Sequence, residues 1–553
     1  MSNKRKGYKI LLVVVLVLIC ITVAVAAVMY IWGQHKEQEY QKKKEQGIIA
    51  ARLLKTDMQE VATVIRQEGW IDLGPAKEEY RKTIFILAQQ REEEAKRLKE
   101  IKEMLPTEPL YVNTTLHLLD AANKLTPALV DKGSSVSVIG FDYLKADGQF
   151  NKYKVRYGEA EGYIDLKYLD KTYEEAMVMQ GDASHYAIHG ERGDVLGGGG
   201  AADLDYEPRE KGNFENNIMP AECRTLYVSA WRVHEIDKYI ELAKKSDINA
   251  FVVDIQDGTS IGYAGEVMKS YSPTSAEYAC NSVEDYRAAI DKLKQEGYYV
   301  IGRITTFNDT LFVQDHPECG ITDNEGKLLE LSGAYWPSAF DRYTWQYKVD
   351  LALEAVDLMG FNEIQFDYVR FPDLVYEREE NGTIEYHNTY GESKAQAIQR
   401  FLMYATDRLH EKEVYVAADV FGEAGYAYVT AYGQYWPAIS NVVDVICAMP
   451  YPDHFAASNG WKPWEHPHQI ILEWGQKAAS RQAETTSPAV ARTWIQAYNA
   501  IKEPYNVYGA KEVGDQIKGL LDAGLTGGYM TWNSAASLEK YEALLPAFKA
   551  TTE

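Results

Sequence analysis

The chain has 553 residues, of which 81 are acidic and 58 basic, and its formal net charge is -23. Nucleic-acid binding needs clustered Lys and Arg to neutralise phosphates, and the absence of any basic stripe argues against that class. The length exceeds that of one ordinary domain, and 46% hydrophobic residues are enough for at least one large core. An acidic surface rich in Tyr and Trp suits a neutral or cationic ligand, although acidity also serves solubility.

The N-terminal segment is predicted to be a membrane anchor. Residues 10–32 carry no charge, and about twenty apolar residues cross the hydrocarbon core of a bilayer as a helix. Trp32 closes the stretch at an interface-like position, and four basic residues precede it: Lys4, Arg5, Lys6 and Lys9. We expect residues 1–33 to form a cytoplasmic tail and one transmembrane helix in the cell membrane, with the bulk of the chain extracytoplasmic. A cleaved signal peptide is the competing interpretation.

Residues 34–105 are predicted to form a helical or coiled-coil stalk. Glu, Lys, Arg and Gln dominate its second half, with a thin apolar stripe at Ile84, Leu87, Leu98 and Ile101. This charge run indicates a solvated helix face rather than a binding site. Pro106 and Pro109 end the segment.

Residues 109–170 consist of short alternating segments between Gly and Asp turns, which is typical of a small all-β barrel. The succession of VSVIG, YKVRYG and EGYI resembles a bacterial Src-homology-3-like domain, a module that often binds cell-wall peptide or glycan. The resemblance implies a contact with the cell wall, and a plain spacer is the alternative. Residues 171–222 contain few apolar residues and four glycines from Gly197 to Gly200, so we expect a linker.

From residue 223 onward, strand-like and helix-like segments alternate about eight times. The candidate strands are Thr225–Trp231, Ala250–Gln256, Tyr298–Thr305, Glu363–Val369, Val414–Val420, Asp444–Met449, Thr493–Ala497 and Gly528–Trp532. They are apolar on both faces, as in a parallel sheet that is covered on each side. This pattern predicts an α/β fold, a (β/α)8 TIM barrel over residues 223–550. A doubly wound open sheet is the alternative, but no glycine-rich phosphate fingerprint follows the first strand.

Polar residues follow the predicted strands, at the end of the barrel where this fold places its functional sites. They include Asp254, Asp257, Arg303, Thr305, Asp367, Arg370, Asp419, Tyr451, Asp453, Gln496, Trp532 and Asn533. Gathered carboxylates suit glycosidic chemistry, in which one acts as nucleophile or base and another, with a raised pKa, as acid. No metal or other cofactor is expected, because the cysteines lack metal-ligand spacing and the one histidine cluster (His454, His466, His468) lies in a Pro-rich loop.

The segment FDYVRFP is the most informative stretch of the chain. Asp367 ends an apolar strand, where a buried carboxylate is costly unless it is paired. We expect Arg370 to pair with Asp367 and hold it ionised, which suits a nucleophile that faces an oxocarbenium-like transition state. The alternative is an Asp–Arg pair that fastens a loop to the rim of the barrel.

FDYVRFP, with VVDIQD before it and AADVFG and AMPYPDHF after it, resembles the glycosyl hydrolase family long catalogued as a domain of unknown function, over residues 224–546. The resemblance implies kinship with α-glycosidase barrels, whose nucleophile is an Asp at the end of the fourth strand, here Asp367. Their acid/base ends the fifth strand, where this chain has Asp419 instead of the usual Glu, or the sixth. Asp419 is the favoured acid/base, and Glu423 and Asp453 are the alternatives.

These observations predict a membrane-anchored, extracytoplasmic glycoside hydrolase with a retaining mechanism and a cell-surface or extracellular polysaccharide as substrate. Asp367 and Asp419 are the predicted catalytic pair, at the roughly 5–5.5 Å that a retaining mechanism needs. The predicted substrate-binding residues are Asp254, Arg303, Arg370, Tyr451, Asp453 and Trp532. The alternative is a non-catalytic glycan- or cell-wall-binding surface protein built on a hydrolase-like barrel.

Overall fold

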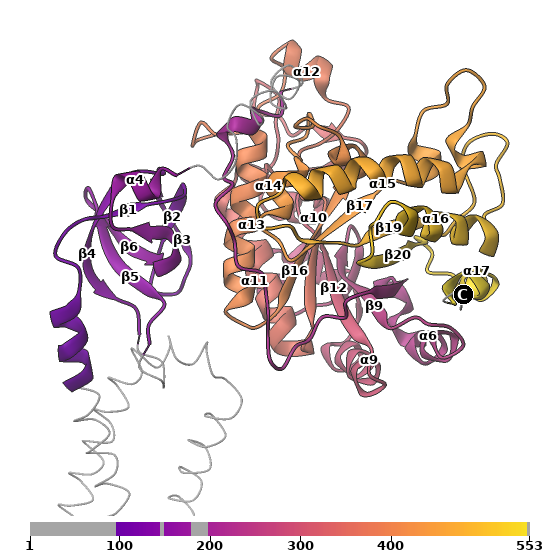
Figure 1. Cartoon of the computed structure of the whole chain (residues 1–553), viewed down its shortest axis with the longest axis horizontal. Coiled ribbons are helices and arrows are strands. Elements are labelled where there is room, and N and C mark those ends of the chain that lie inside the picture. The colour runs from indigo at the N-terminus through magenta and orange to yellow at the C-terminus, as the bar shows by residue number, and fades with distance from the viewer. Residues whose placement is uncertain (1–95, 144–148, 179–196, 550–553) are drawn as a thin grey trace, which may run out of the picture. The chain divides into compact units, whose positions relative to one another are not determined.

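A computed structural model of the chain describes residues 96–143, 149–178 and 197–549 (Figure 1). The predicted transmembrane segment and most of the predicted stalk lie outside these residues. Of the stalk, the structure describes only residues 96–105, and residues 96–104 are helical. Within the described ranges, no helix combines the length and the apolar character needed to cross a bilayer. The chain divides into two compact units, the first ending at residue 171 and the second containing the barrel.

The smaller unit is an all-β sheet of seven strands in the order β3-β2-β6-β5-β4-β1-β7. Its strands are β1 (Leu110–Val112), β2 (Leu116–Leu119), β3 (Leu125–Val130), β4 (Ser135–Phe141), β5 (Lys152–Tyr157), β6 (Ala160–Asp165) and β7 (Leu169–Asp170). The β4–β5 and β5–β6 pairs are antiparallel. Alternate apolar side chains form its core, including Val112, Val136, Val155 and Ile164.

The larger unit is built on a parallel, nearly closed barrel sheet of the TIM type, which confirms the predicted fold class for this part of the chain. Its strands are β8 (Cys223–Val228), β9 (Ala250–Asp257), β12 (Tyr299–Thr305), β15 (Glu363–Asp367), β16 (Tyr415–Phe421), β17 (Val445–Met449), β18 (Val490–Ala491), β19 (Thr493–Gln496) and β20 (Gly528–Trp532). Only Arg492 separates β18, which pairs with β17, from β19, which pairs with β20. Because β20 also pairs in parallel with β8, the first and last strands of the barrel are neighbours.

Helices that follow the strands lie around the outside of this sheet (Figure 1). They are α6 (Ile236–Ala243), α9 (Val283–Gln295), α11 (Arg342–Met359), α13 (Lys394–His410), α14 (Trp436–Ser440), α15 (Pro467–Glu484), α16 (Ala510–Asp522) and α17 (Leu538–Leu544). Local sequence fixes several of their starts, since Ser282, Asp341, Ser393 and Ser537 each accept a hydrogen bond from a backbone N–H in the first turn.

Short elements extend the loops after the first strands of the barrel. After β9 come β10 (Ser260–Tyr263), α7 (Glu266–Tyr271), α8 (Pro273–Glu277) and β11 (Ala279–Asn281). After β12 come α10 (Thr310–Asp315), β13 (Glu330–Leu331) and β14 (Ala334–Tyr335), and α12 (Tyr376–Glu380) follows β15. These loops leave the carboxyl ends of the strands, where the predicted site residues lie.

Part of the predicted linker is fastened to the barrel unit by hydrogen bonds. Gly212 N–H donates to Asp444 Oδ1 at 2.7 Å. Lys211 Nζ donates, at 2.6–3.0 Å, to three carbonyl oxygens at the end of α14 and just after it, those of Ser440, Asn441 and Val443. Burial lowers the pKa of this lysine to about 7. The glycine-rich, polar composition of the segment does not reveal these contacts, because they depend on carbonyls far away in the sequence.

Candidate active site

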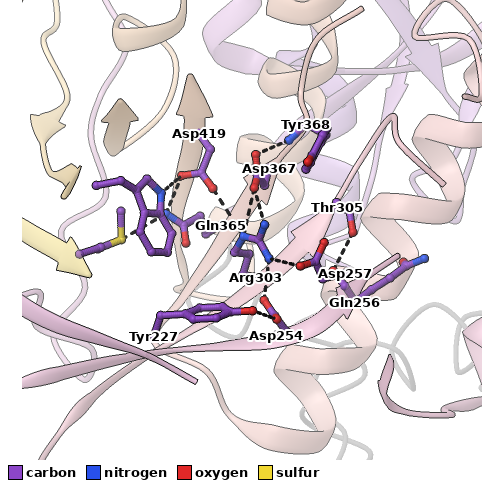
Figure 2. A network of polar contacts seen from close by, with 12 residues as sticks. Tyr227, Asp254, Gln256, Asp257, Arg303, Thr305, Gln365, Asp367, Tyr368 and Asp419 are labelled. Carbon is purple, nitrogen blue, oxygen red and sulfur yellow. Dashed lines mark hydrogen bonds and ion pairs between the residues drawn. The ribbon is translucent and has the colours of Figure 1, made fainter. Parts of the chain in front are cut away.

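Arg303 is the centre of a buried polar network at the carboxyl ends of the barrel strands (Figure 2). It lies in β12, and its side chain is 2% exposed. Its Nη1 donates to Asp254 Oδ1 at 2.7 Å, and its Nε and Nη2 donate to Asp367 Oδ2 at 3.1 and 2.5 Å. Parallel register brings these groups together, since Arg303 pairs with Asp254 in β9 and lies two residues below the level of Asp367 in β15. The guanidinium therefore supplies the charge that both buried carboxylates need.

The predicted pairing of Arg370 with Asp367 is wrong. The chain turns sharply after β15, because Tyr368 has a φ of +49°, and Arg370 is directed to other partners. Arg370 Nη1 donates to the carbonyl of Phe371 at 2.9 Å and to Asp373 Oδ1 at 3.2 Å. Its guanidinium packs against aromatic rings, with its Cζ 4.3 Å from the centroid of Phe421 and 4.9 Å from that of Trp336. Arg370 is thus a packing residue of the loop after β15, and it does not contact Asp367. Its role in substrate binding stays a prediction.

Asp419 lies near the carboxyl end of β16, and the structure brings it beside Asp367. Its Oδ1 accepts hydrogen bonds of 2.8 Å from Gln365 Nε2 and from Trp494 Nε1. Its Oδ2 is 3.8 Å from Arg303 Nε and has no hydrogen-bond partner among the described residues. The side chain is fully buried, and burial, followed by the charge of Asp367, raises the pKa of Asp419 well above its usual value. Asp419 is therefore a buried carboxyl group with a raised pKa and one oxygen that has no hydrogen-bond partner among the described residues.

The two carboxyl groups are close enough for glycosidic chemistry. The Oδ2 atoms of Asp367 and Asp419 lie 3.1 and 3.8 Å from the same Arg303 Nε, which places them no more than about 7 Å apart. Carboxyl groups of retaining enzymes are about 5–5.5 Å apart, and those of inverting enzymes about 6.5–9.5 Å apart. A separation of no more than about 7 Å includes the distance found in retaining enzymes and only the lower end of the range found in inverting enzymes.

Asp254 supports Arg303 from the side opposite Asp367. The side chain is fully buried, and its Oδ2 accepts a hydrogen bond from the hydroxyl of Tyr227. Burial raises the pKa of Asp254 to about 7, although the charge of Arg303 opposes the rise. Asp257, at the end of the same strand, is the most accessible carboxylate of the group, with a side chain 30% exposed and 3.4 Å from Arg303 Nη1. Asp254 is thus placed to hold Arg303, and Asp257 to meet a ligand.

The raised pKa of Asp254 predicts a pH dependence of stability. The group titrates near 3.8 when unfolded, so between about pH 4 and pH 7 the folded protein holds a proton that the unfolded chain has released. The free energy of unfolding should therefore fall as pH rises through this window, with a contribution from Asp254 on the order of 4 kcal/mol. Asp254→Asn cannot ionise and should reduce the fall, as measured by urea unfolding at pH 4.5 and 7.5. Asp237→Asn, an exposed site on α6, should leave the fall unchanged.

Trp532 and Tyr451 lie beside the network. The Trp532 ring centroid is 5.3 Å from Arg303 Cζ, and the ring packs against Tyr227 and Trp494 at centroid distances of 4.9 and 5.6 Å. Tyr451 is 4% exposed and interacts electrostatically with Asp367 and Asp419. The structure therefore places Trp532 in an aromatic wall along one side of Arg303, with Tyr451 near Asp367 and Asp419.

The two alternative acid/base residues are engaged elsewhere. Asp453 is fully buried, and its carboxylate accepts hydrogen bonds from Gln496 Nε2, Tyr498 Oη and Ile501 N at 3.0–3.1 Å. Glu423 accepts hydrogen bonds from the hydroxyls of two tyrosines of its own loop, Tyr428 and Tyr432, at 2.8 and 2.9 Å. Both carboxylates tie loops together, so neither has the unused oxygen that Asp419 has.

The sequence did not single out several members of the network, among them Tyr227, Gln365, Tyr368 and Trp494. For Gln365 a signal was available, since it is a polar residue between Ile364 and Phe366 in an otherwise apolar strand. Tyr227 and Trp494 are indistinguishable in sequence from ordinary core aromatics. In the parts of the chain that the structure describes, no three His, Cys, Asp or Glu side chains are arranged to hold a metal ion. Arg303 occupies the space among the four aspartates.

Comparison with known proteins identifies the family of the barrel. The putative glycosyl hydrolase domain family matches residues 225–538, which is more than half of the chain. The chain belongs to this family. The match confirms the resemblance predicted over residues 224–546, and with it the coarse assignment of the barrel as a glycoside-hydrolase-like domain. No curated protein matches the chain.

Several solved structures are similar to this member of the family. The PgaB (BpsB) glycoside hydrolase domain from Bordetella bronchiseptica shares 12% identity, with a TM-score of 0.42, over 60% of this chain and 99% of that one. A family 20 exo-β-N-acetylglucosaminidase from Vibrio harveyi shares 13% identity, with a TM-score of 0.37, over 60% and 55%. A hypothetical protein from Ruminiclostridium thermocellum shares 28% identity, with a TM-score of 0.30, over 35% and 97%.

Proposed function

We propose that the barrel is a retaining glycoside hydrolase in which Asp367 is the nucleophile and Asp419 the acid/base. The observation that carries this proposal is the contrast between two neighbouring carboxyl groups. Asp367 accepts hydrogen bonds from Arg303 and from the N–H of Tyr368, and its Oδ2 is paired with the guanidinium. Asp419 is buried, burial raises its pKa, and one of its oxygens has no hydrogen-bond partner among the described residues. Two carboxyl groups that differ in this way are suited to the roles of nucleophile and acid.

In the first step, an oxygen of Asp367 forms a bond to the anomeric carbon of the sugar as the bond from that carbon to the glycosidic oxygen breaks. Asp419 gives its proton to that oxygen, which leaves as an alcohol. In the second step, water attacks the anomeric carbon and gives a proton to Asp419, and Asp367 departs as a carboxylate. Arg303 stabilises this departing charge through its two hydrogen bonds to Asp367 Oδ2.

The direct test is release of products from a panel of bacterial surface and extracellular polysaccharides by the purified full-length protein, with the anomer followed by NMR. We expect cleavage with retained configuration. Release with inverted configuration would make Asp419 or a neighbour a base for water. Binding without release, unchanged in Asp367→Asn, would favour the alternative of a non-catalytic glycan-binding protein.

Replacement of Asp419 tests its role as acid/base. Asp419→Ala should slow cleavage of the polysaccharide by about 10²–10⁴-fold, because the leaving oxygen no longer receives a proton. An aryl glycoside with an acidic leaving group should be affected less, and azide should restore its turnover by entering the space left by the carboxyl group. Azide should not rescue Asp453→Ala or Glu423→Ala. Rescue of either of these variants, and not of Asp419→Ala, would assign the acid/base to that residue.

We also propose that the protein is a single-pass membrane protein with the barrel on the outer side. The uncharged stretch of residues 10–32 and the basic residues before it support this topology, and the small β unit is suited to a contact with the cell wall. The protein should sediment with membranes after carbonate washing, and protease added to intact cells should remove the barrel. Release into the soluble fraction with a shortened N-terminus would instead indicate a cleaved signal peptide.

A further inference from the structure

Tyr368, which directly follows Asp367, has an unusual backbone conformation. Its φ of +49° lies in the left-handed region, which a bulky residue adopts only when its surroundings impose it. Both carbonyls of the turn are fixed, because Thr306 N–H donates to the Asp367 carbonyl at 2.8 Å and Phe307 N–H donates to the Tyr368 carbonyl at 3.1 Å. Strain of this kind gathers at functional sites. Glycine would adopt this turn without strain, so a tyrosine here indicates that its ring has a function.

The Tyr368 ring is held in place from one side and partly exposed on the other. Trp336 packs edge-on against it at a centroid distance of 5.8 Å, and the Arg370 Cζ lies 5.2 Å from its centroid. The buried aromatic cage around Arg370 therefore supports Tyr368. Among the described residues, no group forms a hydrogen bond with the Tyr368 hydroxyl. Tyr368 directly follows Asp367 in the chain, and Asp367 and Asp257 both contact the Arg303 guanidinium, at 2.5 Å from Nη2 and 3.4 Å from Nη1 (Figure 2).

Beside Tyr368, carboxyl groups outnumber the cations that pair with them. In the described part of the chain, Arg303 is the one cation that pairs with any of Asp254, Asp257, Asp367 and Asp419. Its Nε, Nη1 and Nη2 are already bonded to two carboxylates. Asp257 is the exposed member and has only the long 3.4 Å contact to Arg303. Arg370, the cation beside the Tyr368 ring, is itself paired with Asp373 at 3.2 Å. An acidic sugar would therefore meet the carboxylate of Asp257 here.

We propose that Tyr368 and Asp257 bind the sugar whose anomeric carbon Asp367 attacks, and that this subsite takes sugars without acidic substituents. The Tyr368 ring packs on the C–H face of the sugar, and Asp257 accepts a hydrogen bond from one of its hydroxyl or amino groups. The same carboxylate repels a sugar that carries a carboxylate or phosphate. This inference rests on the proposed hydrolase function, because it assigns the substrate class of the same site.

The test uses the full-length protein and a matched pair of glycans. One is the polysaccharide that the wild type cleaves, and the other is the same polymer after oxidation of its primary alcohols to carboxylates. We expect the wild type to cleave the oxidised polymer at least about 100-fold more slowly than the neutral polymer. Asp257→Asn should reduce this difference between the two polymers, and should lower kcat/KM on the neutral polymer about tenfold. Tyr368→Ala should raise KM by at least about tenfold, with a smaller change in kcat.

Three further variants separate the ring from the strained turn. Tyr368→Phe keeps the ring and should retain most of the activity. Tyr368→Gly relieves the strain and should be as impaired as Tyr368→Ala, and recovery of activity in the glycine variant would overturn the role of the ring. Tyr298→Phe is the matched control for loss of the hydroxyl, because Tyr298 directly precedes β12, at the end of the barrel away from the site. Equal cleavage of both polymers by the wild type would overturn the inference alone, whereas failure to cleave any glycan would overturn the proposed function and this inference with it.

Discussion

Asp367→Asn is expected to abolish glycan cleavage, with kcat reduced by about 10⁴-fold or more. An amide oxygen cannot form the covalent glycosyl intermediate, and it does not stabilise positive charge on the anomeric carbon as a carboxylate does. Asn has the same shape and can still accept a hydrogen bond from Arg303, so the barrel should remain folded. The measurement is reducing-end release from the polysaccharide under saturating conditions, beside a circular dichroism spectrum of each variant.

The matched control for this variant is Asp237→Asn. Asp237 lies on α6, its side chain is 72% exposed, and it pairs with Lys292 at 2.8 Å, far in sequence from the network. The same chemical change there should leave the rate unchanged. If Asp367→Asn retained more than about 1% of the wild-type rate, Asp367 could not be the nucleophile.

Arg303→Met is expected to cause the largest loss of stability among single replacements in the network. Methionine fills much of the space but leaves buried carboxyl groups without the charge that pairs with them. Loss of one partner from a buried pair costs about 3–5 kcal/mol, which should lower the Tm by about 10 °C. The loss should be smaller at pH 5 than at pH 8, because protonation of Asp254, whose pKa is raised by burial to about 7, removes part of the uncompensated charge.

Thermal unfolding at the two pH values, followed by circular dichroism, measures this effect. Arg232→Met is the control, because Arg232 is 43% exposed and its ion pair with Glu235 at 2.8 Å is on the surface. That replacement should cost less than about 1 kcal/mol at either pH. Equal effects of the two replacements would show that the carboxylates of the network do not depend on Arg303 for their burial.

The sequence by itself determined the class of the fold and the end of the barrel at which the candidate site lies. Runs such as Phe251–Val253 and Val416–Ala418 are apolar on both faces, and that is a local property which specifies buried parallel strands in any context. The ends of the strands follow from the same runs, so the sequence predicts that Asp367 and Asp419 are neighbours at the carboxyl end of the barrel. The family was also evident from the sequence, because its motifs are short and contiguous.

Only the tertiary structure decided which groups pair with one another. Arg370 is three residues from Asp367 and was the natural partner by proximity, yet the turn at Tyr368 directs it into an aromatic cage. The partner is Arg303, 64 residues away, because the register of β12 against β15 brings the two side chains together. The raised pKa of Asp419 likewise depends on burial by residues from other strands. Strand periodicity is encoded within a few residues, whereas register and the path of a loop depend on the packing of the whole barrel.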